Sequence, residues 1–232
     1  LSDYNGFGIS ANGLSDGSID ITAMGGTGVY SYLWVASNGG LIPSGDENSE
    51  DQVGLIAGDY QVTITDENGC SYAEQWTLTE PAELLIEEAL SSHQDVLCFG
   101  DLTGVIEIGI TQESVGPYVY RLTASGTGTL IDQTASISAL SYTFNNLGAG
   151  TYDARVTDIS GNFKEVLNIV IAQPSGDLAI DSAVVSDFTG FGISCNGAND
   201  GSIDLTVSGG TPAYNYSWIG PSGYTASTED VS

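Results

Sequence analysis

Basic residues are nearly absent from this chain. Its 232 residues contain three Lys and Arg against 30 Asp and Glu, which gives a formal net charge of −27 at pH 7. Such a charge repels nucleic acid and anionic lipid alike, and so excludes both as partners of a broad surface. The charge would attract cations, but a solubilising surface is the simpler interpretation.

Histidine, cysteine and long apolar runs are also scarce. The one histidine, His93, has no pattern around it that marks a hydrolytic triad, so we expect no enzyme activity. Three cysteines, Cys70, Cys98 and Cys195, do not make a dense disulfide scaffold or a metal cluster. No run approaches the roughly 20 apolar residues that cross a bilayer, and no signal peptide stands at the start. We therefore expect no membrane insertion.

An internal repeat organises what is present. Residues 2–34 and 186–218 are identical at about two-thirds of their positions without a gap, and their spacing holds two units of roughly 92 residues. A more divergent copy lies between them. Two of the copies end alike, at Glu80-Pro81 and Gln173-Pro174, where proline is a natural break between strands. We predict three units, the first lacking the start of its first strand and the third partial: unit 1 (1–81), unit 2 (82–174) and unit 3 (175–232).

Within a unit, apolar and polar residues alternate. Ile19, Ile21 and Ala23 alternate with polar neighbours, and residues 203–207 repeat the pattern. A period of two predicts antiparallel strands with one buried face. The segment 81–90 is rich in helix formers, but its counterpart in unit 3 is a poor helix, so we predict a strand at both places.

Strands that recur roughly every 8–12 residues in a unit of about 92 residues predict a seven-strand immunoglobulin-like sandwich in each unit. Trp34 and Trp218 supply an aromatic side chain on the third strand, and Tyr60 and Tyr152 each follow a glycine in the manner of a tyrosine corner. The predicted fold class is all-β, with tandem immunoglobulin-like β-sandwich repeats arranged head to tail as a rod.

Two segments of the chain resemble a known family of repeats. The segment from Cys195 to Trp218, with its Asn-Gly, Asp-Gly-Ser-Ile-Asp and Gly-Gly-Thr-Pro elements, is similar to the SprB repeat, and so is the segment from Ala57 to Cys70. Ala11 and Asn162 stand where the family has cysteines, and Leu122 stands where it has tryptophan. The resemblance covers essentially the whole chain and is weakest in unit 2.

The resemblance implies a very large, extracellular cell-surface adhesin of gliding bacteria, exported by type IX secretion and held at the outer membrane. This chain would be a mechanical stalk that extends an adhesive tip and transmits force. Its partners, the gliding and secretion machinery and an external surface or polysaccharide, would be bound by other regions of the protein. Alternatives are repeats that bind polysaccharide themselves, for which Tyr4 and Tyr224 are the only hints, or spacers of a secreted multidomain enzyme.

The family's cysteine positions imply a pattern of disulfides. Each unit has one position before its second strand and one in the turn between its last two strands, and these lie at opposite ends of such a sandwich. A bridge within one unit would exceed the limit of about 7 Å between Cα atoms. We therefore expect Cys70, Cys98 and Cys195 to pair between units, with partners outside this chain. Ala11 and Asn162 would then face each other.

Metal binding has weak candidates only. Asp66, Glu67 and Asp158 lie in acidic turns, and Ca²⁺ prefers six to eight oxygen ligands. The spacing of a twelve-residue calcium loop is missing, and a hairpin turn explains these segments better. We expect no cofactor and no catalytic residue.

Overall fold

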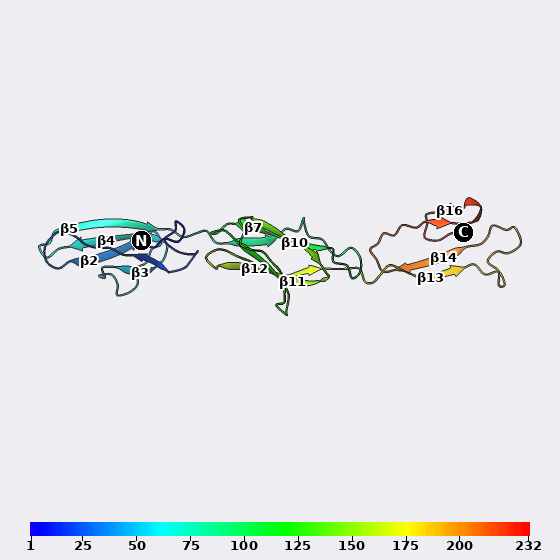
Figure 1. The fold of residues 1–232 in the computed structure, drawn as a ribbon, viewed down its shortest axis with the longest axis horizontal. Helices are drawn as coiled ribbons and strands as arrows, with labels where there is room; N and C mark the ends of the chain where they lie inside the picture. The colour runs from blue at the N-terminus through cyan, green and yellow to red at the C-terminus, as the bar shows by residue number, and fades with distance from the viewer.

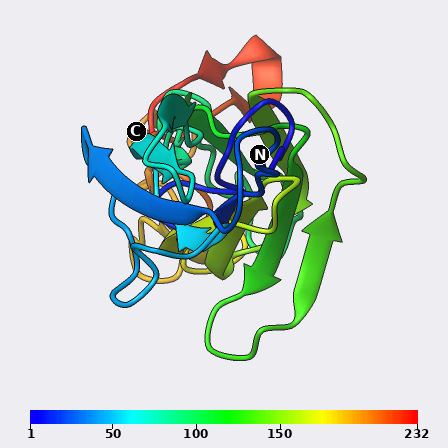
Figure 2. The same ribbon diagram turned by 90° about the vertical axis from the view of Figure 1, so that its left-hand side faces the viewer.

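The computed structural model describes residues 1–232, and β-strands make up all of its regular structure except one turn of 3-10 helix. Figure 1 shows three bodies that follow one another along the long axis in the order of the chain. Seen from the end, the three bodies overlap in one outline (Figure 2). The structure therefore confirms the predicted all-β class.

Unit 2 contains a complete set of seven antiparallel strands in two sheets. One sheet has the order β10–β7–β6 and the other β12–β11–β8–β9. The first, second and fifth strands thus face the other four, which is an immunoglobulin-like arrangement. The strands are β6 (Leu85–Glu88), β7 (Gly104–Gln112), β8 (Val119–Ala124), β9 (Leu130–Gln133), β10 (Ser141–Leu147), β11 (Gly150–Thr157) and β12 (Phe163–Ile171). Strand β6 lies in the helix-prone segment, where the repeat predicted a strand.

The core of unit 2 comes from the alternate positions of these strands. Ile106 and Ile108 of β7 face Tyr120 and Leu122 of β8, and all four are fully buried. Fourteen buried residues form this cluster, which begins at Leu84 and ends at Ile171. Leu122, where the other units have tryptophan, is simply a core residue.

Unit 1 has two sheets, with the orders β2–β4–β5 and β1–β3. The strands are β1 (Gly17–Ile19), β2 (Ser31–Ser37), β3 (Gln52–Leu55), β4 (Gly58–Thr65) and β5 (Ser71–Leu78). Seven buried residues between Ile9 and Leu78 form its core. Trp34 lies within that core, and its indole Nε1 donates a 2.8 Å hydrogen bond to the Ser49 carbonyl. The exact boundaries predicted at 81 and 174 stay predictions.

Strand β1 is shorter than the alternation predicted. It ends at Ile19, whereas the pattern extends to Ala23. In units 2 and 3 the corresponding strand pairs with a first strand, but β1 pairs with β3 alone. Without that second partner, residues 20–24 lack the ladder of hydrogen bonds that defines a strand.

The tyrosine corners predicted at Tyr60 and Tyr152 are both present. The Tyr60 hydroxyl donates a 2.7 Å hydrogen bond to the Ile56 carbonyl, and the Tyr152 hydroxyl donates one of 2.8 Å to the Gly148 carbonyl. Each bond spans four residues and closes the turn before an equivalent strand, β4 in unit 1 and β11 in unit 2. The tyrosines are therefore structural, as their sequence context predicted.

Unit 3 repeats the beginning of unit 1 in detail. Its elements are β13 (Ala179–Val185), β14 (Ile203–Ser208), β15 (Trp218–Ile219), the 3-10 turn Pro221–Gly223 and β16 (Thr225–Ala226). The Ser186 amide donates to the Ser202 carbonyl at 2.9 Å, and the Ser2 amide donates to the Ser18 carbonyl at the same distance. The repeat in the sequence is thus a repeat in backbone geometry.

Candidate functional site

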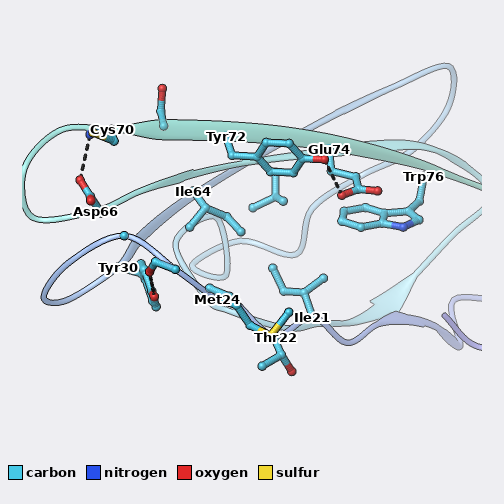
Figure 3. A pocket seen from close by; sticks show the side chains of 15 residues that line it. Ile21, Thr22, Met24, Tyr30, Ile64, Asp66, Cys70, Tyr72, Glu74 and Trp76 are labelled. Carbon is cyan, nitrogen blue, oxygen red and sulfur yellow. Dashed lines mark hydrogen bonds between the residues drawn. The ribbon is translucent and has the colours of Figure 1, made fainter.

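An apolar cleft of about 490 Å³ opens along unit 1. Figure 3 shows Tyr72 and Trp76 of β5 on one side of the cleft, with Ile21 and Met24 on the other. Tyr72 is 64% exposed, whereas Trp76 is half-buried against Trp34, with 5.9 Å between ring centroids. The Tyr72 hydroxyl donates a 3.2 Å hydrogen bond to Oε2 of Glu74.

Strand pairing explains why this cleft is open. In unit 2, β6 pairs with β7, lies against β12 and packs Ile86 on the core. In unit 1 no strand pairs with residues 20–24, so the interior between them and β5 is uncovered. The cleft thus corresponds to the place of a first strand.

The aromatic residues that the sequence singled out lie elsewhere. The Tyr4 hydroxyl donates a 3.2 Å hydrogen bond to the Asp16 carbonyl, and Tyr224 follows the 3-10 turn of unit 3. Tyr72 and Trp76 were missed as a pair. Their spacing of four on one strand puts them on the same face, and this signal could have found them.

The calcium candidates of unit 1 serve a turn. One carboxylate oxygen of Asp66 accepts hydrogen bonds from the amides of Cys70 at 2.8 Å and Asn68 at 3.0 Å, and the other accepts one from Thr27 at 3.1 Å. These bonds, that of Cys70 first, lower the pKa of Asp66. The side chain of Glu67 is exposed beside this turn.

Asp158 has the same role in unit 2. Its carboxylate accepts hydrogen bonds from the Asn162 amide at 2.9 Å and the Ser114 hydroxyl at 2.8 Å. Asp66 and Asp158 belong to corresponding turns of different units, so the fold does not bring them together. No group of three or more His, Cys, Asp or Glu side chains is arranged to hold a metal ion.

The joint between units 1 and 2 is built from polar contacts. The Gly13 amide donates a 2.7 Å hydrogen bond to Oε2 of Glu80, and the Asn12 side chain donates one of 3.3 Å to the Pro81 carbonyl. Lys164, at the start of β12, forms a 2.5 Å ion pair with Glu83 of the connecting segment. The first two contacts fasten the loop of unit 1 to the end of that unit, and the ion pair fastens the connecting segment to β12 of unit 2.

The joint between units 2 and 3 repeats this scheme. The Gly100 amide donates a 3.0 Å hydrogen bond to Oε1 of Gln173, as Gly13 does to Glu80. The Thr211 hydroxyl of unit 3 donates one of 3.1 Å to the Leu97 carbonyl of unit 2. In each case the loop before the second strand is bonded to the last residues of its own unit, next to the start of the following one.

The three cysteines are exposed and free. Cys70 ends the acidic turn of unit 1, Cys98 lies in the loop of unit 2 that faces unit 3, and Cys195 lies in the corresponding loop of unit 3. The structure brings no two of them together. Their pairing between units stays a prediction.

His93 is held between two acids. Its Nδ1 lies 2.6 Å from Oε1 of Glu88, and its Nε2 lies 3.4 Å from Oδ1 of Asp95. The hydrogen bond that the ring makes to the Glu88 carboxylate, above all, raises the pKa of His93. Asp95 in turn accepts a 2.7 Å hydrogen bond from the Ala172 amide, next to the exit of unit 2. The cluster thus fastens the end of β12.

Comparison with known families agrees with the repeat. Residues 12–39 of unit 1 and 193–223 of unit 3 match the sequence model of the SprB repeat. Units 1 and 3 thus each contain a segment that matches the SprB repeat. The matched segments contain β1 and β2 in unit 1, and β14 and β15 in unit 3. No curated protein matches the chain.

Among solved structures, that of the amphioxus IgVJ-C2 molecule is similar, with 12% sequence identity and a TM-score of 0.28 over 69% of this chain and 99% of that chain. SprB repeats occur in cell-surface proteins, and SprB repeats and immunoglobulin-like sandwiches are typically structural, non-catalytic domains. The one helical segment, Pro221–Gly223, is far too short to cross a membrane, and no other helix is present.

Proposed function

We propose that this chain is a repeat segment of a cell-surface adhesin filament and acts as a mechanical stalk. It extends an adhesive tip from the cell and transmits force to that tip in gliding motility. The observation that carries the proposal is the repeated brace at the end of a unit, beside the joint, in which Glu80 and Gln173 accept equivalent hydrogen bonds from Gly13 and Gly100. A joint that recurs with the repeat favours a stiff connection over a flexible linker.

The strand order of unit 2 is suited to resist a pulling force on its two ends. The chain enters at β6 and leaves at β12, which lie in different sheets and contact each other across the sandwich. A pull on both ends runs along these strands and loads their hydrogen bonds together. Resistance then depends on the rate of unfolding more than on equilibrium stability.

The wider setting follows from the family. The filament would be exported by type IX secretion, held at the outer membrane and carried by the gliding machinery, which regions other than these repeats would bind. The net charge of −27 keeps neighbouring filaments apart within about 8 Å, the Debye length at physiological salt. The repeats contribute reach, and the tip contributes specificity.

Single-molecule force spectroscopy tests the stalk role. With handles at residues 1 and 232, we expect separate unfolding events for units 1 and 2, each releasing about 250–300 Å of chain. Handles on β11 and β12 of one hairpin are the control, because that pull separates the hydrogen bonds one after another at lower force. A stalk role is excluded if the end-to-end pull gives a smooth extension without peaks.

A second candidate function is binding of polysaccharide by the repeat itself. It is favoured by the exposed ring of Tyr72 beside Trp76 in the cleft of unit 1. A glycan array with the wild-type chain and with Tyr72→Ala tests it, with Tyr4→Ala as the control for an aromatic residue outside the cleft. Binding that Tyr72→Ala abolishes and Tyr4→Ala retains would establish this function.

A further inference from the structure

Three loops of the chain have the same backbone turn, and in two of them the first residue of the turn is a cysteine. The carbonyl of Ala11 accepts a 3.2 Å hydrogen bond from the Leu14 amide. The carbonyl of Cys98 accepts one of 3.1 Å three residues on, and that of Cys195 one of 3.0 Å. Positions 11, 98 and 195 are therefore one structural position in three successive units.

Two hairpin turns share a second position. The amide of Cys70 donates to Oδ1 of Asp66 at 2.8 Å, and the amide of Asn162 donates to Oδ1 of Asp158 at 2.9 Å. The return bonds match as well, with 3.0 Å from Asp66 to the Cys70 carbonyl and 2.9 Å from Asp158 to the Asn162 carbonyl. Asn162 thus occupies in unit 2 the place of Cys70 in unit 1.

The joint between units 1 and 2 brings the two positions together. Ala11 and Asn162 both line one cavity of about 360 Å³, between the loop of unit 1 and the last hairpin of unit 2. Ala11 is only 3% exposed, although its counterparts Cys98 and Cys195 are exposed. Lys164 and Glu83, an ion pair within unit 2, line the same cavity.

We propose that this joint is a disulfide position: the loop residue of one unit bonds covalently to the hairpin residue of the next. In joint 1–2 the two positions hold Ala11 and Asn162, so neither partner is a cysteine there. Cys98 and Cys195 are then loop halves of such a bond, and Cys70 is a hairpin half. Each bond joins two sulfur atoms as two thiols lose two protons and two electrons to a disulfide oxidant, which is itself reduced to two thiols. Such bonds would carry tension across a joint without loading its hydrogen bonds.

The test restores the pair in the full chain. Ala11→Cys and Asn162→Cys are combined with serine at positions 70, 98 and 195, and the chain is treated with oxidised glutathione. We expect one intramolecular disulfide per chain, seen as the loss of two hydrogens by mass spectrometry and as a linked peptide that contains both positions. A disulfide requires Cα atoms about 4.4–6.8 Å apart, so a joint of different geometry would leave both thiols free and would overturn the proposal.

The matched control keeps the native Cys70 and adds only Ala11→Cys, with serine at 98 and 195. This pair lies within unit 1, and we expect no intramolecular bridge, so a bridge here would contradict the assignment to different units. A second measurement needs no disulfide. A nitroxide attached to Asn162→Cys should broaden the amide resonances of Asn12 and Gly13, and sharp resonances there would also overturn the proposal. Because none of these readouts involves adhesion or force, they fail or succeed independently of the stalk role.

Discussion

The amide of Gly13 and the carboxylate of Glu80 meet at 2.7 Å although 67 residues separate them in the chain. The same bond recurs between Gly100 and Gln173 at 3.0 Å. A carboxylate in one unit and an amide oxygen in the other make the same contact, so the bond requires an acceptor oxygen but not a charged one. The bond ties the end of each unit's last strand to the loop that faces the next unit.

Glu80→Ala should loosen the first joint, because it leaves the Gly13 amide without its acceptor. We expect unit 1 to lose about 1 kcal/mol of stability and the rod to bend more, seen as a shorter maximum dimension in small-angle X-ray scattering. Glu80→Gln is the matched control, because Gln173 already makes this bond in the second joint. Equal behaviour of the two variants would show that the bond does not hold the joint.

Tyr152→Phe should lower the stability of unit 2 by about 1 kcal/mol, because it removes the 2.8 Å hydrogen bond to the Gly148 carbonyl and keeps the ring. Hydrogen exchange of β11 amides measures the effect within one unit, which is necessary in a chain of several units. Tyr72→Phe removes an exposed hydroxyl and should change nothing. A Tyr152→Phe chain with wild-type protection in β11 would disprove the role of the corner.

Gly58→Ala should damage unit 1 far more than Gly150→Ala damages unit 2. A Cβ atom on Gly58, at φ +153°, would lie 2.0 Å from the Gly40 nitrogen, whereas one on Gly150 would meet only the Tyr152 ring at 3.6 Å. The two residues open equivalent strands, β4 and β11. We expect a loss of about 2–4 kcal/mol for Gly58→Ala and less than about 1 kcal/mol for Gly150→Ala in chemical denaturation. Similar losses would contradict the close approach of Gly40.

The stability of unit 2 should depend on the charge of His93. Glu88 raises the pKa of His93 in the folded state above its ordinary value of 6.5, so the folded unit binds this proton more tightly than the unfolded chain does. The stabilisation is therefore complete below pH 6.5 and is lost as the pH rises through the folded pKa. An NMR titration of the His93 ring measures that pKa directly.

The free energy of unfolding of unit 2, measured below pH 6.5 and above the folded-state pKa of His93, shows how much stability the proton contributes. His93→Gln should remove the pH dependence in this window, and Glu88→Gln should return the pKa of His93 toward 6.5. The titration of Asp95 does not overlap with that of His93. The hydrogen bond from the Ala172 amide lowers the pKa of Asp95, so its contribution to stability is lost only at much lower pH. An unchanged pH profile in His93→Gln would show that another group is responsible.

Local patterns in the sequence were sufficient to predict the architecture. Alternation of apolar residues indicated the strands, the recurrence of 2–34 at 186–218 indicated tandem units, and glycine before Tyr60 and Tyr152 indicated the corners that the structure contains. The same comparison of repeats predicted a strand at 81–90 against its helix propensity, and β6 lies there. These features depend on neighbours within a few residues or on repetition, so one sequence displays them.

Tertiary structure decided what depends on distant partners. The end of β1 at Ile19, the open cleft beside Tyr72 and Trp76, and the bond from Gly13 to Glu80 all follow from which strand or loop lies alongside. Alternation encodes that a strand has a buried face, but not whether a neighbour supplies its hydrogen bonds. Contacts between residues tens of positions apart arise only when the chain closes into a sandwich, and that closure places the joints.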